Sequence, residues 1–115
     1  MPIQSTPILS LPVTADGAIA AHRFVTPVGD QAVAGEYTLG VARTAAADAT
    51  LVTVDVLGTT VVEAGAAINA GATLKSDADG KAITWATSGA KVAVALAAAA
   101  AEGDLIEVLL IPNAA

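Results

Sequence analysis

Residues 61–85, VVEAGAAINAGATLKSDADGKAITW, decide the fold of this chain of 115 residues. The stretch contains two phrases in tandem, AGAAI at 64–68 and AGATL at 70–74, and each sets a glycine shortly before apolar residues. The sequence DADG follows at 77–80. Asp-Gly is among the strongest signals for a tight turn between strands, because glycine adopts backbone conformations closed to other residues. We therefore expect a turn-rich centre with strands on either side of it.

The segments around this centre have the pattern of short strands. The clearest is 50–57, TLVTVDVL, in which every second residue is a valine, the period of a strand with one buried face. Gly58 is expected to end it. An alanine run at 97–102 allows at most one helical turn, because so short a helix is marginal and Gly103 would stop it. Further strands are expected at 18–25, 35–43, 82–85, 91–96 and 104–111, which together predict a single all-β sandwich or barrel.

The second half of the sequence echoes the first. The segment AAADATLVTV at 45–54 compares with AAAEGDLIEV at 99–108, an offset of 54 residues (99 − 45 = 54) that also brings Gly35 onto Gly89. Each copy has a strand, an alanine-rich connection that ends in an acid, and an alternating strand. This echo predicts two similar β units, as an old duplication would leave.

The N-terminal segment, residues 1–13, contains three prolines among apolar residues. Proline removes a backbone donor and favours an extended chain before it, so the segment is expected to be an arm or an edge strand, with a loosely ordered terminus as the equal alternative. We assign residues 1–13 to an N-terminal arm whose removal would leave the fold intact, and 14–115 to one β domain. The apolar side chains with which such an arm would contact a neighbouring subunit are Ile3, Ile8, Leu9, Leu11 and Val13.

Composition excludes several classes of protein. The formal net charge is −6, and the five basic residues are scattered singly, which argues against nucleic-acid binding. The absence of cysteine excludes a disulfide framework and thiolate metal sites. The N-terminus lacks the basic region of a secretory signal, and the longest apolar run, 92–101, is about half of a membrane span. We expect a soluble protein with a thin core of small side chains, which oligomerisation or docking would supplement.

No set of residues has the spacing of a catalytic site. His22 is the only histidine, and a lone histidine in a predicted strand is usually a packing or surface residue. Asp77 and Asp79 resemble the opening of a calcium loop, but Ser88 stands at the twelfth position, where that loop needs a glutamate. We expect no catalytic residue, no cofactor and no metal.

The three aromatic residues have two roles open to them. In a chain with 3% aromatic residues they are expected to anchor the core, and the alternative is an interface, where tyrosine and tryptophan are favoured. These candidates are Phe24, Tyr37 and Trp85.

Five phrases of small and apolar residues occur in a characteristic order. They are VVEAGAAI at 61–68, AGATLKSD at 70–77, GKA at 80–82, VALAAA at 94–99 and GDLIEVLL at 103–110. In this order they resemble the capsid cement, or head decoration, proteins of tailed bacteriophages. The resemblance covers residues 29–112, and residues 1–28 lie outside it.

The resemblance implies a small β protein of jelly-roll-like type on the outer surface of an icosahedral head, made in the bacterial host cytoplasm. There it would bind the major capsid protein and clamp neighbouring subunits after shell expansion, as a dimer or trimer. It implies a structural virion protein and not an enzyme, with no nucleic-acid or membrane partner. The alternatives are a receptor- or glycan-binding β module of a virion or cell surface, and a small β-barrel subunit that completes an enzyme active site between chains.

Overall fold

A computed structural model describes residues 5–113, and all regular structure among them is β. None of the described residues belongs to a helix long and apolar enough to cross a membrane. The prediction of an all-β domain is confirmed. The strands are β1 (Thr6–Thr14), β2 (Phe24–Val25), β3 (Gly40–Ala42), β4 (Leu51–Glu63), β5 (Thr73–Ser76), β6 (Ala82–Thr84), β7 (Ala93–Ala95) and β8 (Leu105–Leu110).

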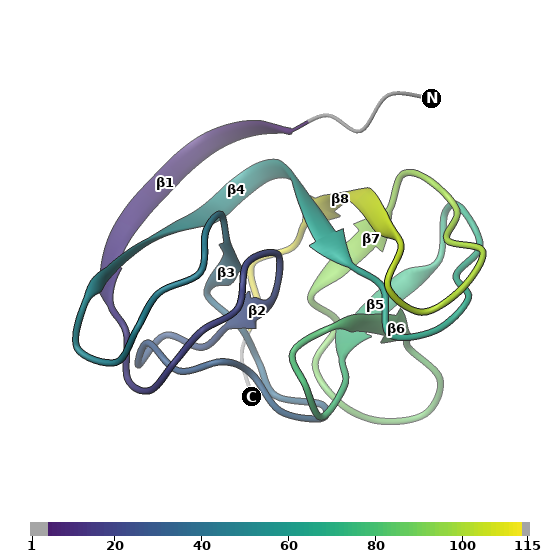
Figure 1. Ribbon diagram of the computed structural model, residues 1–115. Coiled ribbons are helices and arrows are strands. Elements are labelled where there is room, and N and C mark those ends of the chain that lie inside the picture. Colours follow the sequence, from purple (N-terminus) through teal and green to yellow (C-terminus); the bar gives the residue numbers. More distant parts are fainter. Residues whose placement is uncertain (1–4, 114–115) are drawn as a thin grey trace.

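The strands form one antiparallel sheet that curls into a nearly closed barrel (Figure 1). Its order is β2-β3-β4-β8-β7-β5-β6, and β1 pairs with β4 off this path. The two ends of the path approach each other, because the N–H of Phe24 in β2 donates to the carbonyl of Gly80, just before β6, at 2.8 Å. This bond links the two ends of the path within the chain.

The long strand β4 continues through Gly58, where the sequence was expected to end it. Gly58 has a φ of +95°, and a Cβ atom there would lie 2.5 Å from the carbonyl oxygen of Thr6. The pairing of β1 with β4 shifts register opposite this point, between Pro7 and Ser10. The glycine therefore absorbs an irregularity and bends the strand, which continues for five more residues to Glu63.

Both β1 and β8 pair with β4, one after the other along its length. Thr14 of β1 lies opposite Leu51, and the pairing runs to Thr6 opposite Thr59. The pairing with β8 runs from Leu105 opposite Glu63 to Leu109, again opposite Thr59. The beginning of β1 and the end of β8 thus meet at the middle of β4.

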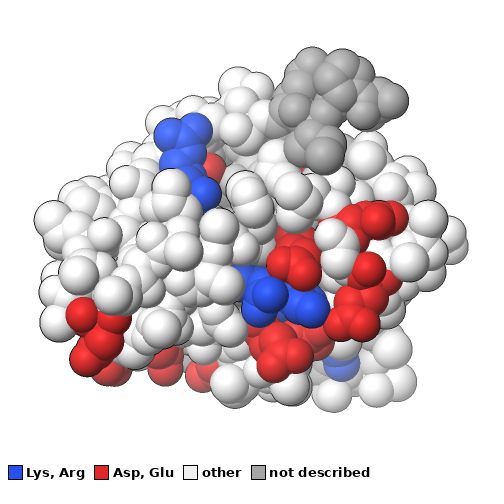
Figure 2. Space-filling view, viewed as in Figure 1, with Lys and Arg blue, Asp and Glu red and all other residues white. Residues whose placement is uncertain are grey.

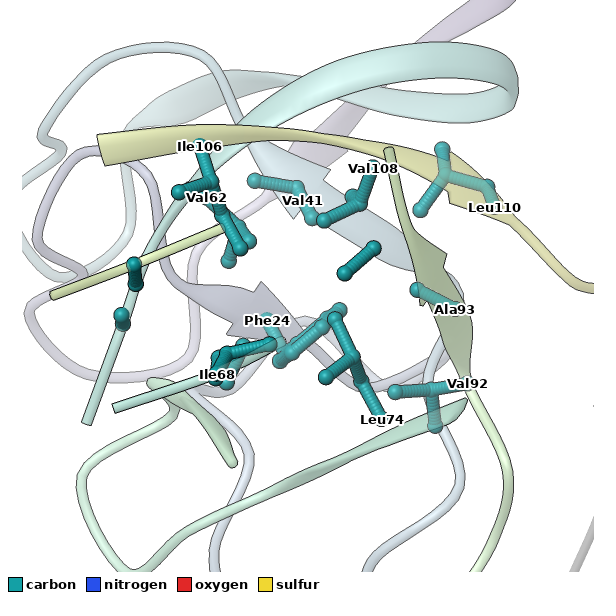
Figure 3. Close-up of a cluster of buried hydrophobic side chains, with 14 of the residues drawn as sticks. Phe24, Val41, Val62, Ile68, Leu74, Val92, Ala93, Ile106, Val108 and Leu110 are labelled. Carbon is teal, nitrogen blue, oxygen red and sulfur yellow. The ribbon is translucent and has the colours of Figure 1, made fainter. Parts of the chain in front are cut away.

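The buried side chains form two clusters, both made mainly of valine and alanine. The larger fills the barrel, where side chains from facing strands point toward one another (Figure 3). It includes Phe24, Ile68, Leu74, Val62 and Val108, all at most 2% exposed. The smaller lies under β1 and the first half of β4 and consists of Ala15, Ile19, Val25, Ala42, Val52 and Val54, with Val13 packed against it.

A buried carboxylate fastens β1 to β4. Asp55 is 1% exposed, and its Oδ1 atom accepts a hydrogen bond of 2.8 Å from the hydroxyl of Ser10 in β1. The hydroxyl of Thr60 donates to Oδ2 at 2.7 Å, and Nε of Arg43 lies 3.2 Å from Oδ1. A buried charge is tolerated only when it is paired and hydrogen-bonded, and this one has three partners from three parts of the chain.

Two local predictions have clear outcomes. The DADG turn lies between β5 and β6 as expected, where Oδ1 of Asp77 accepts from the N–H of Asp79 at 2.8 Å and of Lys81 at 2.9 Å. The alanine run at 97–102 forms bends and a turn, with no helical turn. Its Ala99 instead makes a β-bridge with Ile68.

Replacing Asp55 with alanine should lower the free energy of unfolding by about 2–4 kcal/mol, because the three partners lose their acceptor in a buried site. Ser10→Ala should cost about 1 kcal/mol, since it removes one hydrogen bond. Urea denaturation measures both, with exposed Asp16→Ala as the control for loss of one negative charge. An Asp55→Ala loss no greater than that of the control would contradict the assignment.

Gly58→Ala should destabilise the domain by about 2 kcal/mol or more, because the new methyl group meets the Thr6 carbonyl in a backbone conformation that L residues disfavour. Gly17→Ala is the matched control: φ there is +91°, yet a Cβ atom would meet nothing within 4 Å. Thermal denaturation of the two variants separates the close approach from the backbone cost. Equal losses would mean that the approach to β1 contributes nothing.

Candidate interaction surface

Most of the predicted arm residues lie exposed on β1. Ile8, Leu9 and Leu11 are 80%, 40% and 36% exposed, whereas Val13 is partly buried against the smaller core cluster. The cause is the topology, because β1 pairs with β4 alone and stands at the edge of the sheet. Ile3 lies outside the described residues.

Two further leucines extend this apolar surface. Leu51, 71% exposed, lies opposite Thr14 at one end of β1, and Leu109, 44% exposed, shares Thr59 as a partner with Thr6 at the other. Five of the nine large apolar side chains that are exposed in residues 5–113 thus belong to β1 or lie beside it. We call Ile8, Leu9, Leu11, Leu51 and Leu109 the β1 surface. Leu11 lies opposite the buried Val54 and Leu51 opposite the exposed Thr14, so the β1 surface extends over both faces of the paired strands. Exposed apolar groups along one edge strand are candidates for a site of association.

The sequence analysis did not select Leu51 and Leu109, although a signal was present. Each has an apolar neighbour in its strand, Val52 and Leu110, that side-chain alternation turns toward the core. The leucines therefore had to face outward. What the sequence could not show was that β1 pairs with β4, the strand that carries Leu51, and that β8, which carries Leu109, pairs with β4 next to β1.

The aromatic residues lie elsewhere. Phe24 is fully buried in the larger cluster and therefore has the core role, one of the two roles that the sequence left open for the aromatic residues. Tyr37 and Trp85 are partly buried. The indole N–H of Trp85 donates to the carbonyl of Gly89 at 2.9 Å, and Nζ of Lys91 lies 4.5 Å from the ring centroid. Trp85 is thus engaged by its own chain through both its ring and its N–H.

Charged side chains gather away from β1, around one network. Nε of Arg23 lies 3.2 Å from Oε1 of Glu63, and Nζ of Lys81 lies 3.5 Å from Oε2 of Glu63 and 3.0 Å from Oε2 of Glu102. The hydrogen bond with Glu102 is the main reason that the pKa of Lys81 is raised. The network joins residues beside β2, in β4, beside β6 and before β8, and this makes it a brace across the barrel.

Figure 2 shows the resulting division of the surface. Acidic residues surround a basic group in the lower right of the view, while the upper part, over β1 and β4 in Figure 1, shows one other basic group and is otherwise mostly uncharged. A mostly apolar surface on a chain of net charge −6 is suited to association mainly by burial.

Within residues 5–113, no three His, Cys, Asp or Glu side chains stand close enough to hold a metal ion. The lone histidine makes two backbone hydrogen bonds of 2.9 Å. The backbone N–H of His22 donates to the carbonyl of Ala42, and the carbonyl of His22 accepts from the backbone N–H of Glu63. Glu63, whose N–H donates to His22, is engaged in the charged network described above. The exposed apolar residues of the β1 surface point to association.

Comparison with known proteins agrees with this geometry. Among solved structures, the base of the head fiber gp8.5 of bacteriophage phi29 superposes with a TM-score of 0.73 at 21% identity, over 93% of this chain and 97% of that one. At that identity the likeness establishes a shared fold. No curated protein matches the sequence.

The sequence profile of the phage cement proteins matches residues 3–110. The match takes in the N-terminal segment that the phrases in the sequence did not reach, and it covers nearly the whole domain. The chain therefore belongs to the phage cement protein family, whose members are structural components of the phage capsid.

Proposed function

We propose that this protein binds the outer surface of an icosahedral phage head and stabilises the contacts between its major capsid subunits. The observation that carries the proposal is the β1 surface, where five large apolar side chains are exposed on an edge strand and its immediate neighbours. Membership of the cement family supplies the kind of particle on which such a surface would act.

The energetics favour a rigid strand over a loose arm. Eight residues of β1 have partners in β4, Ser10 is bonded to Asp55, and Val13 packs on the core, so the apolar side chains are already held in one geometry. A surface that is ordered before binding loses less conformational entropy when it binds. Each copy then contributes its buried apolar area at about 25 cal/mol per Å², and many copies add across the shell.

Self-association into a dimer or trimer is part of the same proposal. The core is made largely of alanine and valine, and such small side chains bury little area per residue. Contacts between copies on the shell would add to that burial. Sedimentation of the protein alone and of the protein bound to heads would give the two states separately.

The double substitution Ile8→Ser and Leu11→Ser should weaken binding to expanded heads by roughly tenfold or more, because two apolar side chains no longer leave water. Substitution is preferable to truncation of residues 1–13, which would also remove the partners of β4. Co-sedimentation with expanded heads measures the affinity, and unexpanded proheads are the particle control. Val28→Ser and Val33→Ser, at two exposed valines outside β1, make the matched double variant.

Circular dichroism and the thermal midpoint of both variants should match those of the natural protein, since all four side chains are exposed. Unchanged head binding by the Ile8→Ser, Leu11→Ser protein would remove the β1 surface from the interface. A folded natural protein that binds neither expanded heads nor proheads would overturn the cement role itself, and a glycan array would then test the alternative of a glycan-binding module.

A further inference from the structure

The backbone repeats one set of hydrogen bonds in the two halves of the chain. Ile19 and Ala46 exchange a reciprocal pair, both at 2.9 Å, and Ile68 and Ala99 exchange the same pair at 3.0 and 2.9 Å. These bonds lie in the connections between strands, where nothing in general sheet geometry requires a repeat.

The bonds at the strand ends repeat as well. The N–H of Ala15 donates to Thr50 at 2.8 Å, and the N–H of Ala64, at the corresponding point of the second half, donates to Asp104 at 2.8 Å. Just before these bonds, Val13 lies opposite Val52, and Val62 lies opposite Ile106. The pairing of β1 with the first half of β4 therefore corresponds to the pairing of the second half of β4 with β8.

The strand pairs that lie between these strands in the sequence also correspond. Phe24 pairs with Val41 in the first half, and Thr73 pairs with Val94 in the second. In each half, the residue after the first partner pairs with the residue before the second partner, so both pairings are antiparallel and run in the same direction. Thus β2 and β3 correspond to β5 and β7, and the pairing of Thr84 in β6 with Leu74 corresponds to the isolated bridge of Gln31 with Val25.

Unusual backbone conformations also coincide. Within residues 5–113, the non-glycine residues with positive φ are His22 at 63° and Ala49 at 66°, and their counterparts in the second half are Gly71 at 87° and Gly103 at 94°. Only glycine adopts this conformation without cost, so the shared backbone is a property of the fold and not of the local residues.

We propose that the domain is a closed ring of two equivalent units that share β4. One unit is β1, β2, β3 and the first half of β4; the other is the second half of β4, β5, β7 and β8. Gly35 and Gly89, which the sequence echo aligned, touch: a Cβ atom on Gly89 would lie 2.9 Å from the Cα atom of Gly35. The registers above give this hairpin an offset of 53 residues (Val41 to Val94, 94 − 41 = 53), so the two glycines come from the same region of each unit without being exact counterparts.

The ring has two equivalent junctions, of which only one is covalent. Counting along the paired strands, Val56 corresponds to Leu110, and Leu57 corresponds to Ile8. The first junction is the peptide bond between Val56 and Leu57 inside β4. The second is the place where the end of β8 meets the beginning of β1 opposite Thr59. The end of β8 and the beginning of β1 therefore lie where a continuous strand would close the ring.

A circular permutant tests this closure. The chain would begin at Leu57, run to residue 113, continue through about six glycine and serine residues into residue 5, and end at Val56; an extended linker of this length spans up to about 20 Å. We expect a cooperative urea transition whose midpoint lies within about 1 M of that of the natural protein. The control has the same linker but is opened between Val41 and Ala42, inside β3.

Because both permutants carry the same linker, strain in the linker affects them alike. A permutant opened at Leu57 that is no more stable than the one opened inside β3 would overturn the closure. A second comparison avoids permutation: Ala49→Gly should raise the urea midpoint and Gly103→Ala should lower it, since the two positions share one backbone conformation and the methyl group at Gly103 has open space. Changes of the opposite sign would contradict the equivalence of the units.

Discussion

Pairing along β4 is the constraint on which the rest of this structure depends. This one strand of 13 residues is bonded to β1, β3 and β8, and both core clusters include its side chains. Because successive side chains of a strand point to opposite faces, a slip of one residue in its register would expose the valines of both halves at once. Gly58, with its bend, and Asp55, with its three polar partners, hold that register near the middle of the strand.

The sequence predicted those elements whose causes are local. Alternating valines located the first half of β4, and the DADG turn and the apolar alternation at 105–110 were recognised for the same reason. Gly58 was misjudged because glycine signals a break, whereas here a register shift in the partner strand accommodates its positive φ. The strand β5 was hidden inside the second alanine-glycine phrase, because its hydrogen bonds come from β6 and β7 and leave little trace in its own residues. Leu51 and Leu109 were missed for a similar reason, since their position beside β1 is a product of pairing between segments distant in the sequence.

The pairing of the basic side chains within the chain determines which surfaces are left for a partner. Each of the five basic side chains is occupied within the chain: Arg23 by Glu63, Arg43 by Asp55, Lys75 by the carbonyl of Ser88, Lys81 by Glu63 and Glu102, and Lys91 by the ring of Trp85. The basic groups are therefore engaged in contacts within the domain, and the surface offers a partner either excess acid or the mostly uncharged β1 region. Copies whose surfaces carry excess acid repel one another except where uncharged surfaces meet, which favours orderly association over random aggregation.

The distance along the chain between β1 and β4 has a consequence for biosynthesis. The partners of β1 follow it by 37 residues at Thr14 and Leu51 and by 53 residues at Thr6 and Thr59 (51 − 14 and 59 − 6). At roughly 5–20 residues per second, the nascent strand has no partner for about 2–10 s, with its isoleucine and leucines unprotected. The two prolines within β1 each remove a backbone donor, which makes the waiting strand a poor template for pairing with other chains. The same prolines that suggested an arm or an edge strand in the sequence thus suit a strand that must stay unpaired until β4 has been synthesised.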